Sequence, residues 1–426
     1  MSPGPLWLFF LLLGGSSPSE RTLTVTLTAG PELVPPRQNA AAASDGHYLY
    51  HLLGQDLDFE EGHASFLEDG HRLDPSGVES AELLPPLDFL SGGSSAIVYD
   101  GLLLVQGGNI WLGDGAAIPS WYSPRDILDA SDEAVRAAWD LPDKTDDQTW
   151  LGADIVATVW VLDLAAFEAG TGSWSAHHAT IPRTGASFAL LEGGQLAIVS
   201  GNYYPGYGND PLPIAQQCGY SQDGAEVVAF QCSVRSTEVF DPETLTWSVD
   251  DRYELRQGRN AGAVSSGDDF ALVTGGLAIE GVDQDITWPQ EQAEIFVADT
   301  DERFRFVEPP IAVGTASGTH LGNTAWVHAE RRLVDYLPAG DGTEEDFVWD
   351  ETTWLLGYDL AEDRWALGPL PGDNLDNTRL IAAQGRLWIL GGYARSEEGD
   401  AMVDSLIEVE AILEPLVGGG CGGWLR

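Results

Sequence analysis

The chain has 426 residues, of which 43% are hydrophobic, and its formal net charge is −47 at pH 7 with a pI of about 4.1. So negative a surface repels phosphate backbones and anionic membranes, which argues against nucleic acid as a partner. The 50 glycines and 15 tryptophans argue against a mostly helical protein and favour an all-β chain with many turns.

The chain begins with an apolar segment. Leu6 to Leu13 is an unbroken apolar run, followed by small residues, and it is too short to span a bilayer. This pattern is typical of a signal peptide, although no Lys or Arg precedes the run and no clean A-x-A site follows it. We therefore expect residues 1–17 to direct export, with the protein secreted, periplasmic or at the cell surface. A buried strand is the alternative. No later segment looks transmembrane.

From residue 39 onward, one two-strand element recurs six times. Each copy is a strand of small residues, a turn of two to four residues, and an apolar strand that ends at glycine. So short a connection predicts an antiparallel hairpin. The copies are 39–55, 94–109, 185–203, 262–276, 323–342 and 378–393, with glycine stops near Gly54, Gly108, Gly201, Gly276, Gly340 and Gly392.

A second element follows four of these hairpins. It is an apolar strand, an acidic turn and an aromatic residue, at 158–174, 236–247, 293–304 and 354–365. Aspartate in such a turn can bond the backbone two residues on, which favours a tight reversal. Together the two elements predict a four-stranded meander with a period of about 50 residues. Small residues on the first strand suit a crowded central axis, and Trp174, Trp247 and Trp365 suit the outer strands.

Two insertions interrupt these units, at 110–156 and at 203–232. The first contains a stretch, 123–142, that favours a short helix with Ser131 as its N-cap. Both follow a second strand and so leave from the same face, where long loops usually carry function. Cys218 and Cys232 lie in the second insertion, and a bridge across a loop of roughly 15 residues would contribute about 3 kcal/mol. Two free thiols are the alternative.

The two ends of the chain are expected to meet. The last unit offers residues 405–413 as its third strand and then stops without a fourth. The alternating segment 22–37 looks like that missing strand, so it would close a ring. Residues 414–426 are expected to form a Gly-rich flexible tail that contains Cys421.

These units resemble the kelch repeat family. The marks are the paired glycines Gly107-Gly108, Gly275-Gly276 and Gly391-Gly392, the arginine before the first strand, and the aspartate-then-tryptophan turn. The resemblance covers roughly residues 22–413 and implies an all-β, six-bladed kelch-type β-propeller with the N-terminal strand closing the last blade; seven blades is the alternative. It does not specify a function, because kelch propellers host many activities.

Four arginines take nearly the same place in their units, just before or at the start of a first strand: Arg37, Arg183, Arg259 and Arg379. In a closed ring that place repeats around the channel mouth, where guanidinium groups would grip carboxylates. In the kelch propellers of ubiquitin-ligase adaptors and in the similar periplasmic sialic-acid epimerases, arginines hold an acidic peptide or a sugar acid. The resemblance therefore implies an anion pocket. The alternative is that each arginine only satisfies backbone carbonyls between blades.

The sequence thus predicts a monomeric, non-catalytic binding module for an acidic peptide or a carboxylate-bearing glycan at one face of the propeller. A sugar epimerase or oxidase-like enzyme on the same fold is the first alternative, and it requires a proton-transfer group near the arginines. A structural or adhesive surface protein is the second. No metal or cofactor is expected, because the eight histidines form no spaced ligand set and no phosphate-binding glycine loop is present.

Overall fold

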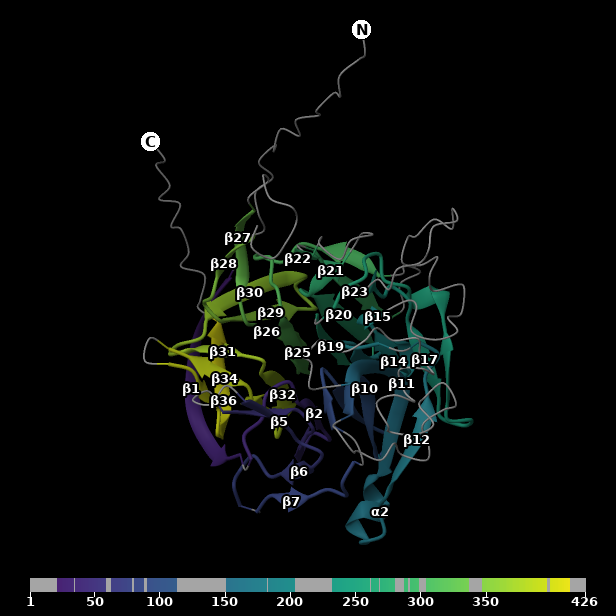
Figure 1. The fold of residues 1–426 in the computed structure, drawn as a ribbon. Coiled ribbons are helices and arrows are strands. Elements are labelled where there is room, and N and C mark those ends of the chain that lie inside the picture. Colours follow the sequence, from purple (N-terminus) through teal and green to yellow (C-terminus); the bar gives the residue numbers. More distant parts are fainter. Residues whose placement is uncertain are drawn as a thin grey trace, which may run out of the picture.

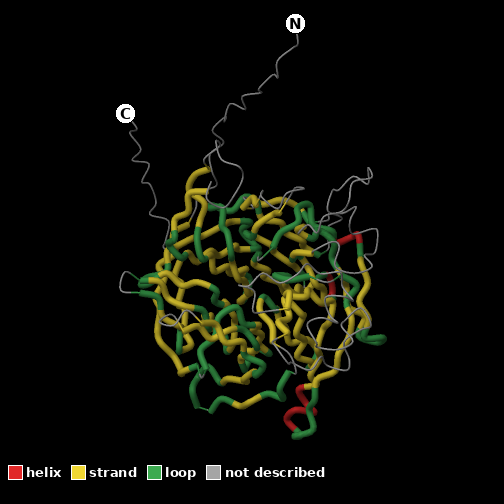
Figure 2. Tube along the Cα trace, in the orientation of Figure 1, coloured by secondary structure: helices red, strands yellow, loops and turns green. Residues whose placement is uncertain are grey.

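Strands dominate the part of the chain that the structure, a computed structural model, describes (Figure 2). The described residues are 21–33, 35–58, 63–78, 80–87, 90–112, 151–181, 183–203, 232–260, 262–267, 269–279, 287–289, 292–298, 304–336, 347–396 and 399–413. Within them the helical elements are one α-helix, α2 (Leu164–Glu168), and the 3-10 turns η1 (Glu192–Gly194) and η2 (Asp251–Tyr253). The chain is therefore all-β, as the glycine content predicts.

Four sheets repeat one order, in which strands follow the chain from the first to the fourth. They are β2 (Ala41–Ser44), β3 (Leu49–Leu52), β6 (Gly70–Leu73) and β7 (Glu82–Leu83); β9 (Ser95–Tyr99), β10 (Leu102–Leu112), β11 (Leu151–Asp163) and β12 (Trp174–His178), with β8 (Leu90–Gly92) also beside β10; β13 (Ser187–Leu190), β14 (Leu196–Val199), β17 (Glu238–Asp241) and β18 (Thr246–Val249); and β19 (Ala263–Gly267), β20 (Phe270–Thr274), β23 (Ala293–Val297) and β24 (Arg305–Val307).

A fifth, eight-stranded sheet completes the arrangement. Its order is β25 (Ala316–Leu321), β26 (Thr324–Ala329), β29 (Trp354–Asp359), β30 (Arg364–Pro369), β1 (Arg21–Glu32), β36 (Ser405–Leu413), β33 (Arg386–Leu390) and β32 (Arg379–Ala383). The link between its halves is short, since β30 and β1 pair in parallel only at Arg21 and Thr22.

The first strands of these sheets form a closed circuit of neighbours. β2 contacts β9, β9 contacts β13, and the chain of contacts continues through β19, β25 and β32 back to β2. In Figure 1 the labels β2, β19, β25 and β32 lie near the middle of the molecule, and β1, β7 and β12 lie toward its rim. The sheets therefore have a propeller-like arrangement around a central axis.

The hydrophobic core lies between neighbouring sheets rather than at the axis. One buried cluster joins Ala41 and Tyr50 to Leu103 and Trp160 of the next sheet, and four other clusters likewise combine residues of two neighbouring sheets. The sixth cluster, which contains Leu355 and Leu380, lies between the two halves of the eight-stranded sheet. Each sheet is thus apolar on both faces, so removing one would expose the core surfaces of two others.

The aromatic residues of the acidic turns lie on outer strands, as predicted. Trp174 begins β12, Trp247 lies in β18 and Trp365 lies in β30. The indole of Trp174 also donates to the carbonyl of Pro85 in the preceding sheet, at 2.8 Å. Asp241 accepts from the backbone N–H of Glu243 at 2.9 Å, which is the predicted bond two residues on.

The predicted meeting of the chain ends is confirmed. β1 pairs antiparallel with β36 from Leu23 with Leu413 to Ala29 with Ile407. The side chain of Leu23 is 3% exposed and packs in the same cluster as Leu355 and Val409. Because both ends of the described chain share this sheet, closure of the ring depends on both.

The connections after the second strands form small sheets, one of which also includes β31, the strand before β32. They are β4 (Gln55–Asp58) with β5 (His63–Phe66), β15 (Asn202–Tyr203) with β16 (Cys232–Ser233), β21 (Leu277–Ile279) with β22 (Thr287–Pro289), β27 (Arg332–Tyr336) with β28 (Phe347–Asp350), and β31 (Asn374–Asp376) with β34 (Tyr393–Arg395) and β35 (Ala401–Met402). Glycine stops hold this face together through backbone bonds to the next sheet, from Gly201 N–H to the carbonyl of Arg259, from Gly276 to Gly314 and from Gly392 to Arg37, at 2.7–2.8 Å.

The fifth hairpin differs from the prediction by one strand. The sequence places it at 323–342, but β25 and β26 form the hairpin, so Thr324–Ala329 is the second strand and not the first. Glu330 and Arg331 therefore stand where other units have glycine, and Gly340 is not the stop.

Several predictions lie outside the described residues. These are the signal peptide at 1–17, the helix in 123–142, most of both insertions, the tail 414–426, and the residues Cys218 and Cys421. The Cys218–Cys232 disulfide therefore stays a prediction. No helix among the described residues has the length and hydrophobicity needed to cross a bilayer.

Candidate functional site

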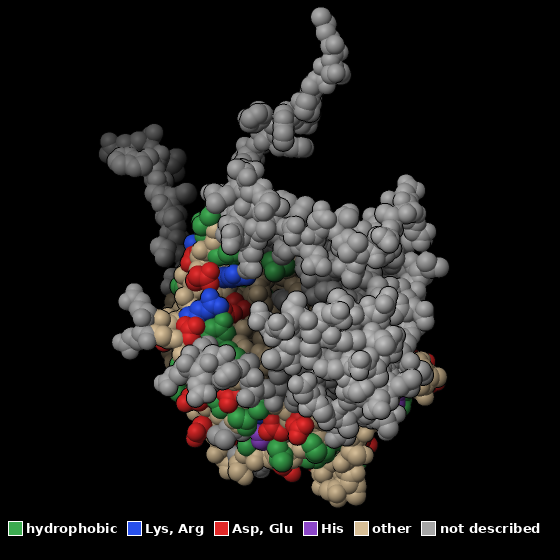
Figure 3. All heavy atoms as spheres, in the orientation of Figure 1, with side chains coloured by type: hydrophobic (Ala, Val, Ile, Leu, Met, Phe, Trp, Pro, Cys, Tyr) green, Lys and Arg blue, Asp and Glu red, His purple; other side chains and the backbone are tan. Residues whose placement is uncertain are grey.

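A cavity of about 840 Å³ lies where the first strands converge. Its wall contains small residues from every strand of the circuit, among them Ala43 of β2, Ser95 of β9, Ser187 of β13, Ser266 of β19 and Gly318 of β25. In Figure 3 the surface has a hollow near its centre, bordered on one side by basic and acidic side chains. Volumes of this size are typical of sites for small ligands.

Hydroxyl groups hold the cavity wall together. The Ser266 Oγ accepts from the backbone N–H of Leu190 at 2.8 Å, and the Ser317 Oγ accepts from that of Leu380 at 3.0 Å. Both bonds cross between neighbouring first strands. The Ser95 hydroxyl oxygen is buried and has no hydrogen-bond partner.

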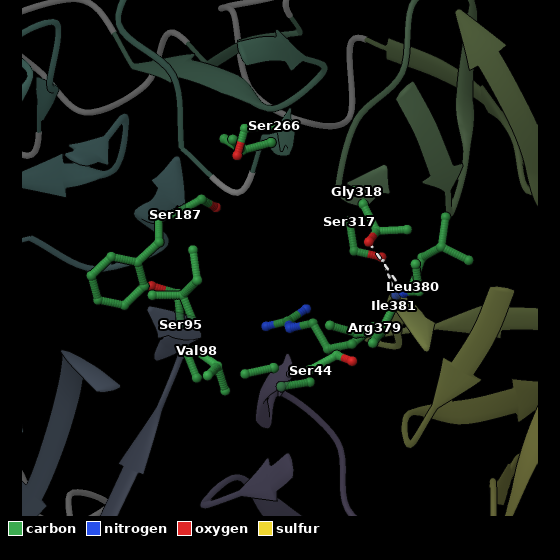
Figure 4. A pocket seen from close by; sticks show the side chains of 18 of the residues that line it. Ser44, Ser95, Val98, Ser187, Ser266, Ser317, Gly318, Arg379, Leu380 and Ile381 are labelled. Carbon is green, nitrogen blue, oxygen red and sulfur yellow. Dashed lines mark hydrogen bonds between the residues drawn. The ribbon is translucent and has the colours of Figure 1, made fainter. Parts of the chain in front are cut away.

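Arg379 is the one Arg or Lys among the described residues that line the cavity. Its Nε donates to the carbonyl of Ala40 at 2.9 Å and its Nη1 donates to that of Thr378 at 3.2 Å. It forms no ion pair with a carboxylate of the described residues. Figure 4 shows its guanidinium extending into the cavity between Ser95, Ser187 and Ser317. These two backbone bonds aim the remaining N–H groups at the open space.

The other three arginines of the predicted set are placed differently. Arg37, Arg183 and Arg259 are 0% exposed, and each is bonded inside its own sheet. Arg183 donates to the carbonyls of Ser200 and Ser236 and pairs with Glu238 at 2.8 Å. Arg259 pairs with Glu294 at 2.8 Å, and Arg37 pairs with Asp69 at 3.0 Å. The structural alternative that the sequence leaves open is correct in that these arginines bond backbone carbonyls, but the bonds lie within one sheet rather than between blades, and each arginine also pairs with a carboxylate.

Register explains why one arginine differs from three. The first paired residues of their strands are Ala41, Ser187, Ala263 and Arg379. Arg379 therefore belongs to the cavity wall itself, whereas Arg37, Arg183 and Arg259 each precede that place by four residues, in the connection before the strand. The sequence alone makes the four contexts look alike because no strand boundary is visible in it.

A buried carboxyl group lies behind Arg379. Glu330 is 6% exposed, and its Oε1 has no hydrogen-bond partner. Burial, and next the neighbouring carboxylate of Asp376, raise the pKa of Glu330 well above its usual value. The sequence analysis missed this residue, although its place in the repeat, where other units have glycine, could have found it.

Two side chains of β34 contact the carboxylate of Asp376. The Tyr393 hydroxyl donates to Asp376 Oδ2 at 3.0 Å, and Arg395 forms an ion pair with the same oxygen. Nearby, His328 is fully buried, with its Nδ1 at 3.3 Å from the Thr378 hydroxyl, and burial lowers its pKa to about 4. The described residues include no cluster of three side chains that could hold a metal ion.

Comparison with known proteins gives the fold and no family. No family model matches the chain, and no curated protein matches its sequence. Solved structures do match, in 354 chains. One is the structure of YjhT, a kelch-like β-propeller protein, with 13% sequence identity and a TM-score of 0.55 over 92% of this chain and 98% of the other. The chain has a β-propeller fold. At this identity the likeness establishes architecture and carries no activity with it.

Proposed function

We propose that the chain is a six-bladed kelch-type propeller that binds a carboxylate-bearing ligand in its central cavity through Arg379. The blade count is supported by the strand order, since the eight-stranded sheet divides into β25-β26-β29-β30 and β32-β33-β36-β1, each with a first strand in the circuit. Kelch character is supported by the glycine stops and by the aspartate-bonded turns.

The observation that carries the proposal is the difference between Arg379 and its three counterparts. Burying an arginine without a carboxylate is costly, and Arg37, Arg183 and Arg259 all have one. Arg379 has none among the described residues and extends into a cavity. Burial lowers its pKa, but a guanidinium stays charged, so the position favours an anion from outside.

The cavity favours a carboxylate-bearing glycan over a long acidic peptide. It is enclosed by six strands, and polar side chains such as Ser44, Ser187 and Asn377 line it together with Arg379. Hydroxyl and amide groups near a single guanidinium match a ring with several hydroxyls and one carboxylate. A peptide would have to lie across the mouth rather than enter.

A glycan and peptide array screened with the purified protein tests the proposal. The expected result is capture of acidic glycans by the wild type and its loss in Arg379→Gln, at an unchanged melting temperature. Arg252→Gln is the matched control, since the Arg252 side chain is 67% exposed and forms an ion pair with its near neighbour Asp250. If the Arg379→Gln variant still captures acidic glycans, the binding site does not lie in the cavity.

An enzyme on the same fold remains the second candidate because of Glu330. A carboxyl group with a raised pKa near a guanidinium is the proton-transfer group that an epimerase needs. Deuterium incorporation into a bound sugar acid in D₂O would support catalysis, and incorporation lost in Glu330→Gln would assign it. Binding without exchange supports the non-catalytic module. If neither binding nor exchange is observed, the structural or adhesive protein is supported.

Export and the Cys218–Cys232 disulfide belong to the same proposal. Extracytoplasmic compartments are oxidising and preserve disulfides. N-terminal sequencing of the mature protein is expected to show cleavage near residue 17. Mass analysis with and without reductant is expected to find no alkylatable thiol at either cysteine before reduction.

A further inference from the structure

We propose that anion binding at Arg379 is coupled to proton uptake by Glu330, so that the cavity holds a carboxylate tightly only while Glu330 is neutral. This inference rests on the proposed function, because it names the regulation of the same site. The coupling depends on the buried carboxyl group of Glu330, which is not needed for ligand recognition alone.

The position of Glu330 makes the coupling direct. Its backbone N–H donates to the carbonyl of Thr315 at 3.2 Å, and Thr315 lines the cavity. Its carboxyl group faces Asp376 and the backbone of Asn377, and Asn377 and Arg379 line the cavity from the other half of the eight-stranded sheet and the connection before it. Glu330 therefore lies between the two halves of this sheet, directly behind the part of the cavity wall that contains Arg379.

The charged and titratable groups around Glu330, which follows the last residue of β26, come from four strands. They are Asp376 from β31, Arg379 from β32, Tyr393 and Arg395 from β34 behind Asp376, and His328 from β26. Arg395 pairs with Asp376 and the Tyr393 hydroxyl donates to it, whereas Oε1 of Glu330 has no hydrogen-bond partner. Burial without a donor favours the neutral form of Glu330, and the pKa of Glu330 is raised accordingly.

The two protonation states differ in what Arg379 presents. When Glu330 is neutral, the charge of Arg379 lacks a nearby counter-charge and attracts a ligand carboxylate. When Glu330 is ionised, it neutralises part of that charge and repels the ligand across the wall, with little water to screen the repulsion. Linkage makes the effect reciprocal, so a bound carboxylate raises the pKa of Glu330 further and proton uptake accompanies binding.

The sign of the pH dependence follows. Affinity is highest at pH values where Glu330 is protonated and falls as the pH rises through its pKa. A coupling of ordinary size gives a loss of roughly tenfold between the two limits. The opposite order, with tighter binding at higher pH, would require a group that must lose a proton, and Glu330 is not such a group.

A first experiment needs no ligand. Infrared difference spectra of the wild type minus Glu330→Gln, recorded against pH, follow the carbonyl band of the protonated carboxyl group. We expect that band to persist at neutral pH and to extend to higher pH in Arg379→Gln, because the guanidinium favours the ionised form. The coupling is refuted if the band is absent at neutral pH, or if the pH at which it disappears is the same in Arg379→Gln as in the wild type.

A second experiment measures binding of glucuronate by calorimetry at several pH values. We expect the wild type to lose affinity roughly tenfold as pH rises, and Glu330→Gln to bind tightly at every pH, since the amide imitates the neutral acid. Glu351→Gln is the control: it removes a half-exposed carboxylate that pairs with Arg395, and its pH profile should match the wild type.

The outcomes separate the two proposals. No glucuronate binding to the wild type at any pH, with none of the array glycans captured, refutes the proposed function, and the infrared titration then still decides whether Arg379 and Glu330 interact. Binding that depends on Arg379 but keeps its pH profile in Glu330→Gln refutes the coupling alone.

Discussion

Arg183 and Glu238 form an ion pair of 2.8 Å in which neither side chain is exposed to solvent. The second carboxylate oxygen of Glu238 accepts from the backbone N–H groups of Thr180 and Ile181, so one glutamate ties the arginine of its sheet to the connection that precedes it. Arg259 and Glu294 repeat this arrangement in the next sheet, where Glu294 accepts from Gln257. The arginines that the sequence marks as ligand residues thus join the strands within a blade.

Removing one partner of this pair is expected to destabilise the protein. Arg183→Met leaves Glu238 buried without its counter-charge, which costs about 3–5 kcal/mol, whereas the combined Arg183→Met and Glu238→Leu variant should recover part of the loss. Urea unfolding measures both. An Arg183→Met variant within about 1 kcal/mol of wild type would show that the pair contributes little, which is the ordinary result for exposed pairs.

One glycine stop has serine, Ser200, in place of its first glycine, and we expect that introducing the glycine stabilises the protein. Ser200 has φ of 62°, is fully buried, and its hydroxyl has no hydrogen-bond partner. Ser200→Gly removes both the left-handed strain and the unsatisfied hydroxyl, so we expect a gain of about 1 kcal/mol in the free energy of unfolding. Ser200→Ala retains the strain and removes only the hydroxyl, so it should gain less. A loss of stability in Ser200→Gly contradicts the strain argument.

The N-terminal strand β1 is expected to contribute strongly to the free energy of unfolding, although many of its residues are exposed. Leu23→Ala removes a buried side chain of β1, and such a change costs about 2–5 kcal/mol. Thr26→Ala, at an exposed position of the same strand, is the control and should stay within about 0.5 kcal/mol. Equal melting temperatures for the two variants would mean that β1 does not close the ring through its apolar face.

His328 predicts a loss of stability in mild acid. Its pKa is about 4 in the folded protein, below the ordinary 6.5, so the unfolded chain takes up the proton first as pH falls. Stability from this group is therefore complete above about pH 6.5 and is lost toward pH 4, by about 2 kcal/mol between pH 7 and pH 5. His328→Gln should lack this component. The comparison is the wild-type minus variant difference in unfolding free energy at both pH values, and a constant difference would refute the assignment.

Glu330 acts in the opposite direction on stability. Its pKa is raised in the folded state, so the folded protein holds a proton that the unfolded chain releases above about pH 4.5. That component of stability is lost as pH rises toward the folded pKa. Glu330→Gln should therefore be more stable than the wild type at alkaline pH and similar near pH 4. Chemical unfolding at pH 4.5 and pH 9 checks this crossing, and parallel behaviour of the two proteins would contradict it.

The sequence by itself determined the repeat, the all-β class, the outer position of Trp247 and Trp365, and the pairing of the two chain ends. These depend on local rules, since side-chain size, turn chemistry and alternation are visible in short stretches. Only the tertiary structure decided which arginine faces the cavity, because a shift of four residues in register separates Arg379 from Arg183 and no local signal marks that boundary. It also decided the surroundings of Glu330, because burial and the approach of Asp376 arise between units that are far apart in the chain.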